Sequence, residues 1–179
     1  SVVEQARNAL QVLKTNRGRA YETALEKIKS SPQELDDLAN SVRKITTEIA
    51  DEYGLKYVSQ TEKLGQKLNV VDFSGSTITE GTASVEKAMN DILGWTDNTA
   101  AGLDKLKKRV GDYLSQVPKN SPASSLLSKI RSSLDSALKK NVKGYEGMTK
   151  EYRLASEMID EIEGSLSLGQ GKEMETVAK

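Results

Sequence analysis

Apolar residues recur every three or four positions along most of the chain, the spacing that gathers them on one face of an α-helix. This pattern predicts an N-terminal helix followed by three long helices, over about 32–68, 82–117 and 122–166. Polar and charged residues fill the other positions, so each helix is amphipathic. We therefore expect an all-α fold, an elongated antiparallel helical bundle of three to four long helices.

Three of the helix starts carry capping residues. Ser1 and Glu4 have the spacing of a capping box, in which each side chain accepts a hydrogen bond from the other residue's backbone N–H. Ser31 and Ser121 can each cap a helix, and the proline after each of them suits the first helical position. Pro118 ends the helix that precedes Ser121.

Residues 69–82 break the helical pattern, because they are rich in β-branched and turn-forming residues. We expect a short irregular or hairpin-like insertion here, and it holds Phe73, the only Phe of the chain, and Ile78. Loops on rigid scaffolds often carry binding residues, so Phe73 and Ile78 are candidate interaction residues. An ordinary connection between two helices is the alternative interpretation.

A second break, at residues 94–98, contains Trp95, the only Trp of the chain. A large aromatic side chain beside a helix break can plug the core or anchor a partner protein. We favour the plug, and we keep Trp95 as a candidate interaction residue.

Composition argues against catalysis. The chain has no His and no Cys, which removes the side chains behind most base catalysis, thiol chemistry and transition-metal binding. The segment 164–172 resembles a phosphate-binding loop only superficially, because Gln170 stands where such a loop needs Lys. Acidic residues such as Asp36, Asp37 and Asp160 lie in helices, where solvent-exposed faces explain them. We expect no enzyme activity, no cofactor and no catalytic or metal-binding residue.

Charge is unevenly distributed although the net charge is zero. Residues 31–102 carry six basic and twelve acidic groups, for −6, and residues 103–150 carry eleven basic and four acidic groups, for +7. Oppositely charged helices lying side by side in one bundle would explain this pattern. The alternative is a nucleic-acid-binding face, for which Lys105, Lys108 and Arg109 are the candidates because they share one helical face. Few aromatic residues accompany them, so base stacking gains little support.

Other features of the chain bear on its partners and its boundaries. No apolar run approaches the roughly 18 residues that a membrane span needs. Many Ser residues lower the intrinsic helicity, so the helices depend on packing against neighbours or partner chains. The chain begins at Ser1 and remains helix-forming to Lys179, as a fragment of a longer protein would. We expect a helical bundle domain over 1–168, then a linker and the start of a further helix over 169–179.

The texture of the sequence resembles helical segments of large tailed-bacteriophage virion proteins, such as minor structural, internal or tape-measure-like polypeptides. The features that carry this resemblance are the absence of His and Cys, stretches such as Ala20-Tyr21-Glu22-Thr23-Ala24-Leu25, and Ser/Thr/Asn-rich helices broken by small loops, as at 94–102. The resemblance implies a structural role in a phage particle or its assembly, with the protein in the virion or the host cytoplasm.

These observations together predict a non-catalytic structural or interaction module that binds protein partners or itself. One alternative is a helical nucleic-acid-binding protein that uses the basic 103–150 region, whose binding would fall steeply with salt. Another is a surface or secreted helical adhesin or effector that uses the 69–82 insertion or Trp95.

Overall fold

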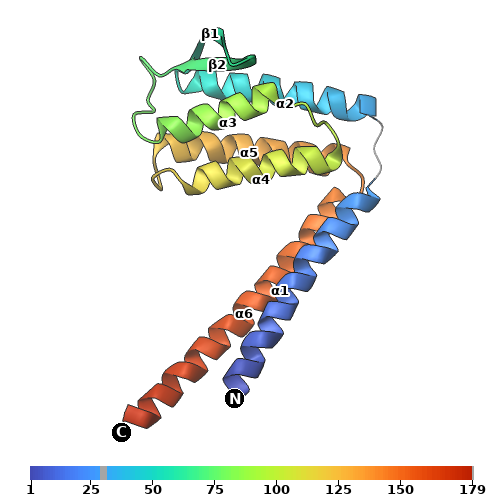
Figure 1. Ribbon diagram of the computed structural model, residues 1–179, viewed down its shortest axis with the longest axis vertical. Coiled ribbons are helices and arrows are strands. Elements are labelled where there is room, and N and C mark those ends of the chain that lie inside the picture. Colours follow the sequence, from blue (N-terminus) through green and yellow to red (C-terminus); the bar gives the residue numbers. More distant parts are fainter. Residues whose placement is uncertain (29–31, 179) are drawn as a thin grey trace. The chain divides into compact units, whose positions relative to one another are not determined.

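The computed structural model describes residues 1–28 and 32–178 (Figure 1). In this part of the chain the fold is helical apart from one two-stranded sheet, which confirms the helical class. The elements are α1 (Val2–Lys27), α2 (Pro32–Glu52), β1 (Lys56–Lys63), β2 (Gln66–Asp72), α3 (Thr82–Gly94), α4 (Ala100–Ser115), α5 (Pro122–Asn141) and α6 (Tyr145–Ala178).

The chain divides into two compact units. The helical hairpin is made of Ser1–Ile28 and Gly144–Lys179, and so contains α1 and α6 from opposite ends of the sequence. The central bundle is made of Lys29–Lys143, the continuous segment between them. The expected division was a helical bundle domain over 1–168, followed by a linker and the start of a further helix over 169–179. The two compact units do not follow this division, and α6 continues as helix through position 169, where the sequence predicted a linker.

The central bundle is a ring of four helices, in which α2 and α4 each pack against both α3 and α5 (Figure 1). Short connections make α3, α4 and α5 successively antiparallel. The apolar stripe of each helix faces the centre of the ring, as the 3-4 spacing predicts. The side chains buried there include Leu38, Val42, Val85, Met89, Leu103, Val110, Leu127, Ile130, Leu134 and Leu138.

The predicted helix over 32–68 is wrong beyond Glu52, where α2 ends. Gly54 follows with a φ of +75°, a left-handed conformation that favours glycine and stops a helix. Residues Lys56–Asp72 then form an antiparallel β-hairpin, in which Tyr57 lies opposite Val71. β1 contains Tyr57, Val58 and Thr61, and β2 contains Val70 and Val71, residue types that favour strands and outweighed the weak helical spacing of the segment. The insertion expected near 69–82 thus begins earlier and ends in a connection over 73–81.

Two other long helices are each broken into two. The predicted helix over 82–117 is α3 and α4, separated at 95–99, the break that the sequence marked around Trp95. The predicted helix over 122–166 is α5 and α6, separated at 142–144, where Gly144 has a φ of +90°. The described residues form six helices, so the expected three to four long helices are not confirmed.

Capping at two helix starts agrees with the sequence pattern. Ser1 and Glu4 form the predicted capping box at the start of α1. The Ser121 hydroxyl accepts a hydrogen bond from the Ser124 backbone N–H, and Pro122 occupies the first turn of α5. Ser31, the third predicted cap, lies outside the described residues.

The helical hairpin pairs α1 and α6 in antiparallel fashion (Figure 1). Arg17 Nη1 donates a hydrogen bond of 3.0 Å to Ser156 Oγ. The Tyr21 and Tyr152 rings meet edge to face with their centroids 5.3 Å apart. Lys14 forms an ion pair with Glu163 further along the pair. Residues later in α1 therefore contact residues earlier in α6, as in any antiparallel pair of helices.

Candidate interaction surfaces

The connection over 73–81 is fastened to the end of α2. The Tyr53 carbonyl accepts hydrogen bonds from Ser76 Oγ at 2.7 Å and from the Thr77 N–H at 3.3 Å. These bonds direct Ile78 inward, where it is only 2% exposed. Ile78 is therefore a core residue of the central bundle, and its selection as an interaction residue is not supported by its position. The large apolar side chain was a signal of burial.

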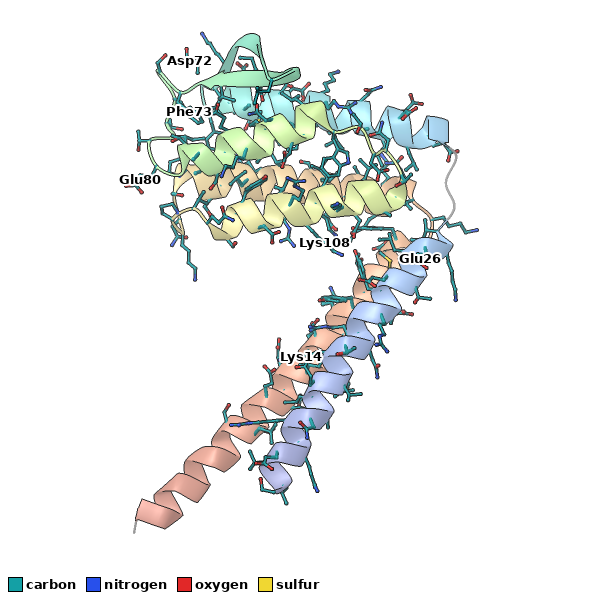
Figure 2. The ribbon with its side chains drawn as sticks, in the orientation of Figure 1. Lys14, Glu26, Asp72, Phe73, Glu80 and Lys108 are labelled. Carbon is teal, nitrogen blue, oxygen red and sulfur yellow. The ribbon has the colours of Figure 1, made fainter. Side chains whose placement is uncertain are left out.

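Phe73 lies directly after β2 and is half-buried (Figure 2). Its neighbours Asp72 and Ser74 form a tight turn, since Asp72 Oδ1 accepts hydrogen bonds from the Ser74 N–H at 2.9 Å and from its Oγ at 2.6 Å. The hydrogen bonds from Ser74 lower the pKa of the Asp72 carboxyl. This turn fixes the backbone beside Phe73, which remains a candidate for contact with a partner.

Trp95 is half-buried at the connection between α3 and α4. Its Nε1 donates to the Asp97 carbonyl at 2.9 Å, and its own carbonyl accepts a 2.5 Å hydrogen bond from Arg43 Nη2 of α2. The Arg109 guanidinium of α4 stands 5.7 Å from the centroid of the Trp95 ring. The Trp95 side chain is thus neither a fully buried core plug nor a fully exposed anchor.

The basic run of α4 is engaged in ion pairs inside the central bundle. Lys107 Nζ lies 3.0 Å from Asp135 Oδ1 of α5 and 3.9 Å from Asp104 Oδ1. Lys108, labelled in Figure 2, lies 3.1 Å from Asp104 Oδ2. Asp104 is 1% exposed, so its charge is compensated by these lysines rather than by water. Lys105 is exposed on the same helix.

Arg109 also has a carboxylate partner. Its Nε lies 3.2 Å from Asp91 Oδ2 of α3, and Tyr113 donates a 2.6 Å hydrogen bond to the same oxygen. The neighbouring Tyr113 hydroxyl and Asp91 raise the pKa of Arg109, which keeps its charge fixed. Burial raises the pKa of Tyr113 and the hydrogen bond to Asp91 adds to the rise, so its hydroxyl remains a donor.

Ion pairs of the same kind link other helices of the central bundle. Lys139 lies 2.8 Å from Asp135 within α5, and Lys129 of α5 lies 3.8 Å from Glu52 of α2. Burial would raise the pKa of Asp135, but hydrogen bonds from Lys139 and Lys107 outweigh it and hold the pKa below its usual value. Two of these ion pairs, Arg109 with Asp91 and Lys129 with Glu52, join the basic 103–150 region to the acidic 31–102 region, whereas Asp104 and Asp135 belong to 103–150 itself.

A groove of about 620 Å³ runs between α2 and α5. Leu38 and Ile45 line it from α2, while Ser132 and Ser136 line it from α5. The small Ser side chains leave this space open. Glu34, Asp37 and Lys140 also line it, and the described residues contain no cluster of three His, Cys, Asp or Glu side chains that could hold a metal ion.

Leu154 and Met158 form an exposed apolar ridge on α6, called the α6 ridge, which the sequence pattern did not predict. Leu154 is 50% exposed and Met158 is 48% exposed, one turn apart on the helix. The predicted stripe of this helix passes through Tyr152 and Ile159, and the two ridge residues lie beside it. Large apolar residues next to an already complete stripe were the available signal.

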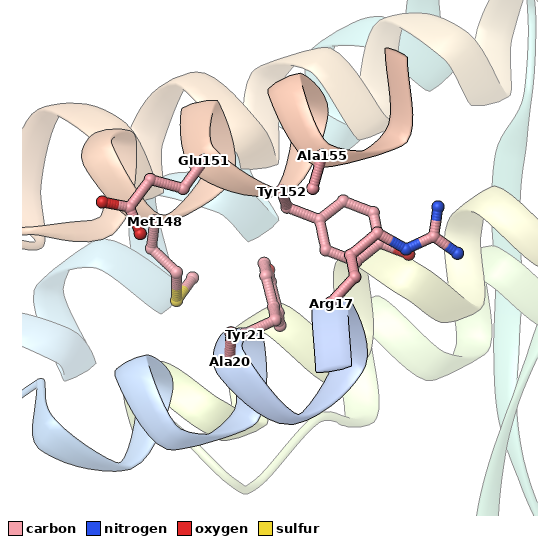
Figure 3. Close-up of a pocket in the computed structure, with 7 residues that line it drawn as sticks. All are labelled: Arg17, Ala20, Tyr21, Met148, Glu151, Tyr152 and Ala155. Carbon is pink, nitrogen blue, oxygen red and sulfur yellow. The ribbon is translucent and has the colours of Figure 1, made fainter. Parts of the chain in front are cut away.

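A small pocket of about 50 Å³ lies between α1 and α6 (Figure 3). Ala20 and Tyr21 line it from α1, and Met148, Glu151 and Ala155 line it from α6. The small alanine side chains leave this space between the helices open.

Comparison with protein families, with curated proteins and with solved structures found no match for this chain. Among the described residues, no helix is both long enough and apolar enough to cross a membrane.

Proposed function

We propose that this chain is a non-catalytic structural and interaction module that serves as an assembly component of a tailed-phage particle. The exposed apolar ridge on α6 carries the first half of this proposal. Leu154 and Met158 keep about half of their surface in water, although burying such side chains contributes about 1.5–3 kcal/mol each. A helix that leaves them exposed is suited to a protein partner.

The polar groups of the central bundle support a scaffolding role. Asp104, Asp91 and Asp135 each hold cations of the bundle through ion pairs, several of which join different helices. Ion pairs of this kind hold the helices in a fixed relative position, which suits a scaffold. The phage assignment rests on the resemblance of the sequence.

Purified particles of the phage that encodes the chain provide the test. We expect quantitative mass spectrometry to find it at a fixed copy number per particle, and to lose it from particles when its gene is disrupted. A chain that is absent both from purified particles and from their assembly intermediates would overturn the phage assignment. Disruption of the gene should also reduce the yield of complete particles.

Nucleic-acid binding is the second candidate, and the exposed Lys105 and Lys143 favour it. Its test is fluorescence anisotropy of a labelled DNA duplex, and of the matching RNA, at low and high salt. Binding that falls with salt and weakens in Lys105→Glu, but not in Lys44→Glu on the acidic helix α2, would support it. Because several neighbouring cations already have carboxylate partners, we expect no such binding.

One observation supports the alternative that the chain is an adhesin or effector. Leu64, at the turn of the β-hairpin, is 98% exposed and has a φ of +55°. Few non-glycine residues adopt that conformation, and Leu is an unusual choice there. Binding of the purified chain to host cells, lost in Leu64→Ser, would support this alternative.

A further inference from the structure

The α6 ridge and the pocket of Figure 3 lie on one face of the helical hairpin. Glu151 lines the pocket, and Leu154 and Met158 follow it by three and seven residues. Residues at this spacing share one face of a helix, because seven residues complete nearly two turns. The ridge therefore continues along α6 from the edge of the pocket.

The flank of α1 on the same face carries small side chains. Ala20 lines the pocket, and Asn16 and Ala9 precede it by four and eleven residues on the same face. All three are exposed. The face thus combines the exposed apolar side chains of Leu154 and Met158 on α6 with an α1 flank that carries two alanines.

The pairing of α1 with α6 shows which residues of the two helices lie at the same level, that is, at the same height along the helix axes. Tyr21 lies against Tyr152, so Leu154, two residues further along α6, is level with Arg19 and next to Ala20. A two-fold axis parallel to the helices keeps every residue at its level. It would carry the Leu154 of a second copy onto the Ala20 flank and the pocket beside it.

The net charges of α1 and α6 favour a two-fold axis parallel to the helices over one that runs across them. Helix α1 carries five basic and three acidic residues, for +2, and α6 carries three basic and eight acidic residues, for −5. An axis parallel to the helices places each α1 against the partner's α6, with opposite charges facing each other and all neighbours antiparallel. An axis across the helices would instead pair α1 with α1 and acidic α6 with acidic α6, which repel.

We propose that the helical hairpins of two copies of this chain associate through this face into an antiparallel four-helix bundle, with Leu154 of each copy seated on Ala20 of the other. The inference deepens the proposed function and rests on its claim that the chain is an interaction module. It names the partner of the α6 ridge as a second copy.

The first test is the solution mass of the full chain by light scattering and sedimentation, over a range of concentrations. We expect a dimer, and we expect Leu154→Glu to weaken dimerisation about tenfold or more, because it places a charge in the apolar contact. Thr15→Glu is the matched control, since Thr15 is exposed and lies about 140° around α1 from Ala20. Circular dichroism checks that both variants keep their helices.

The second test uses cysteines, of which the chain has none. A chain with Ala20→Cys and a mass-tagged chain with Leu154→Cys are mixed and oxidised. We expect the disulfide between the two different chains to form faster than either disulfide between identical chains. Thr15→Cys mixed with Leu154→Cys is the control and should form little of the mixed product, because Thr15 is exposed about 140° around α1 from Ala20.

Three outcomes would overturn the proposal. These are a monomer at every concentration, a dimer that Leu154→Glu leaves unchanged, and disulfides that join identical chains preferentially. The proposed function fails separately, since the mass and disulfide tests use the purified chain and the particle test does not. A monomer found at a fixed copy number in particles would keep the assembly role and remove the self-association.

Discussion

The central bundle and the helical hairpin use the same amphipathic spacing with different results. In the bundle each helix has two or more neighbours, so side chains such as Leu127, Leu134 and Val110 are completely buried. In the helical hairpin each helix has one partner, so α1 and α6 can bury only a narrow stripe. Leu10 and Ile159 are buried there, while Leu154 and Met158 beside the stripe remain exposed. The number of neighbours, more than the hydrophobic pattern, decides how much of a helix is covered.

Truncation of a buried leucine should separate the two units most clearly. Leu134→Ala should lower the free energy of unfolding by about 3 kcal/mol, because it opens a cavity in a fully enclosed core. Leu10→Ala in the helical hairpin should cost about half as much, since solvent and neighbouring side chains can fill the space. Urea titrations followed by circular dichroism give both values, and equal losses would contradict the comparison.

Glycine substitutions should have opposite signs in the two units. A Cβ at Gly102 of the central bundle would lie 2.3 Å from Asp97 Cγ, so Gly102→Ala should cost about 2 kcal/mol. A Cβ at Gly18 of α1 would meet nothing within 4 Å, and Gly18→Ala should stabilise by up to about 1 kcal/mol through helix propensity. Thermal unfolding of the two variants measures both changes in stability. A destabilising Gly18→Ala would show that the space beside Gly18 is not open.

Acid should remove one stabilising contribution of the central bundle. The pKa of Asp135 is lowered in the folded state, so its contribution is complete above its unfolded pKa and is lost as the pH falls through the folded value. The window therefore lies below about pH 4. Asp135→Asn should cost about 1 kcal/mol at pH 7 and less at pH 3. A difference between wild type and variant that does not shrink on acidification would contradict the role given to this carboxylate.

The smallest expected effect lies in the helical hairpin. The Arg17 guanidinium stands 4.9 Å from the centroid of the Tyr152 ring and binds Ser156. Arg17→Ala should cost about 0.5–1 kcal/mol, because these contacts are partly solvated. Arg19→Ala, at an exposed position two residues away, is the control and should change stability little. Urea titration distinguishes them, and a loss as large as that of Leu134→Ala would place Arg17 among the main determinants of the fold.

Helix identity could be predicted wherever start signals and apolar stripes agreed. Ser1 with Glu4 and Ser121 with Pro122 begin helices because their side chains satisfy backbone N–H groups that only the first turn leaves unpaired. Beyond Gly54 the spacing predicted a continued helix, and this was wrong because strand pairing outweighed the helical spacing of the segment.

The candidate residues divide in the same way. Trp95 was expected beside a helix break and stands there, tied to α2 and α4 by Arg43 and Arg109. Ile78 was expected on a functional insertion and is buried instead. Lys108 was a candidate for a nucleic-acid-binding face, and it pairs with Asp104, which stands four residues away on the same helix.

By itself, the sequence determined the amphipathic helices, their capped starts and the absence of His and Cys chemistry, because propensity, capping and composition act locally. Only the tertiary structure decided which helices became neighbours, which cations met carboxylates and which apolar residues stayed exposed. The physical reason is that burial and charge pairing depend on residues distant in the sequence, such as Arg109 with Asp91 or Tyr21 with Tyr152. Leu154 is the clearest case, because its exposure follows from α6 having a single partner within the helical hairpin.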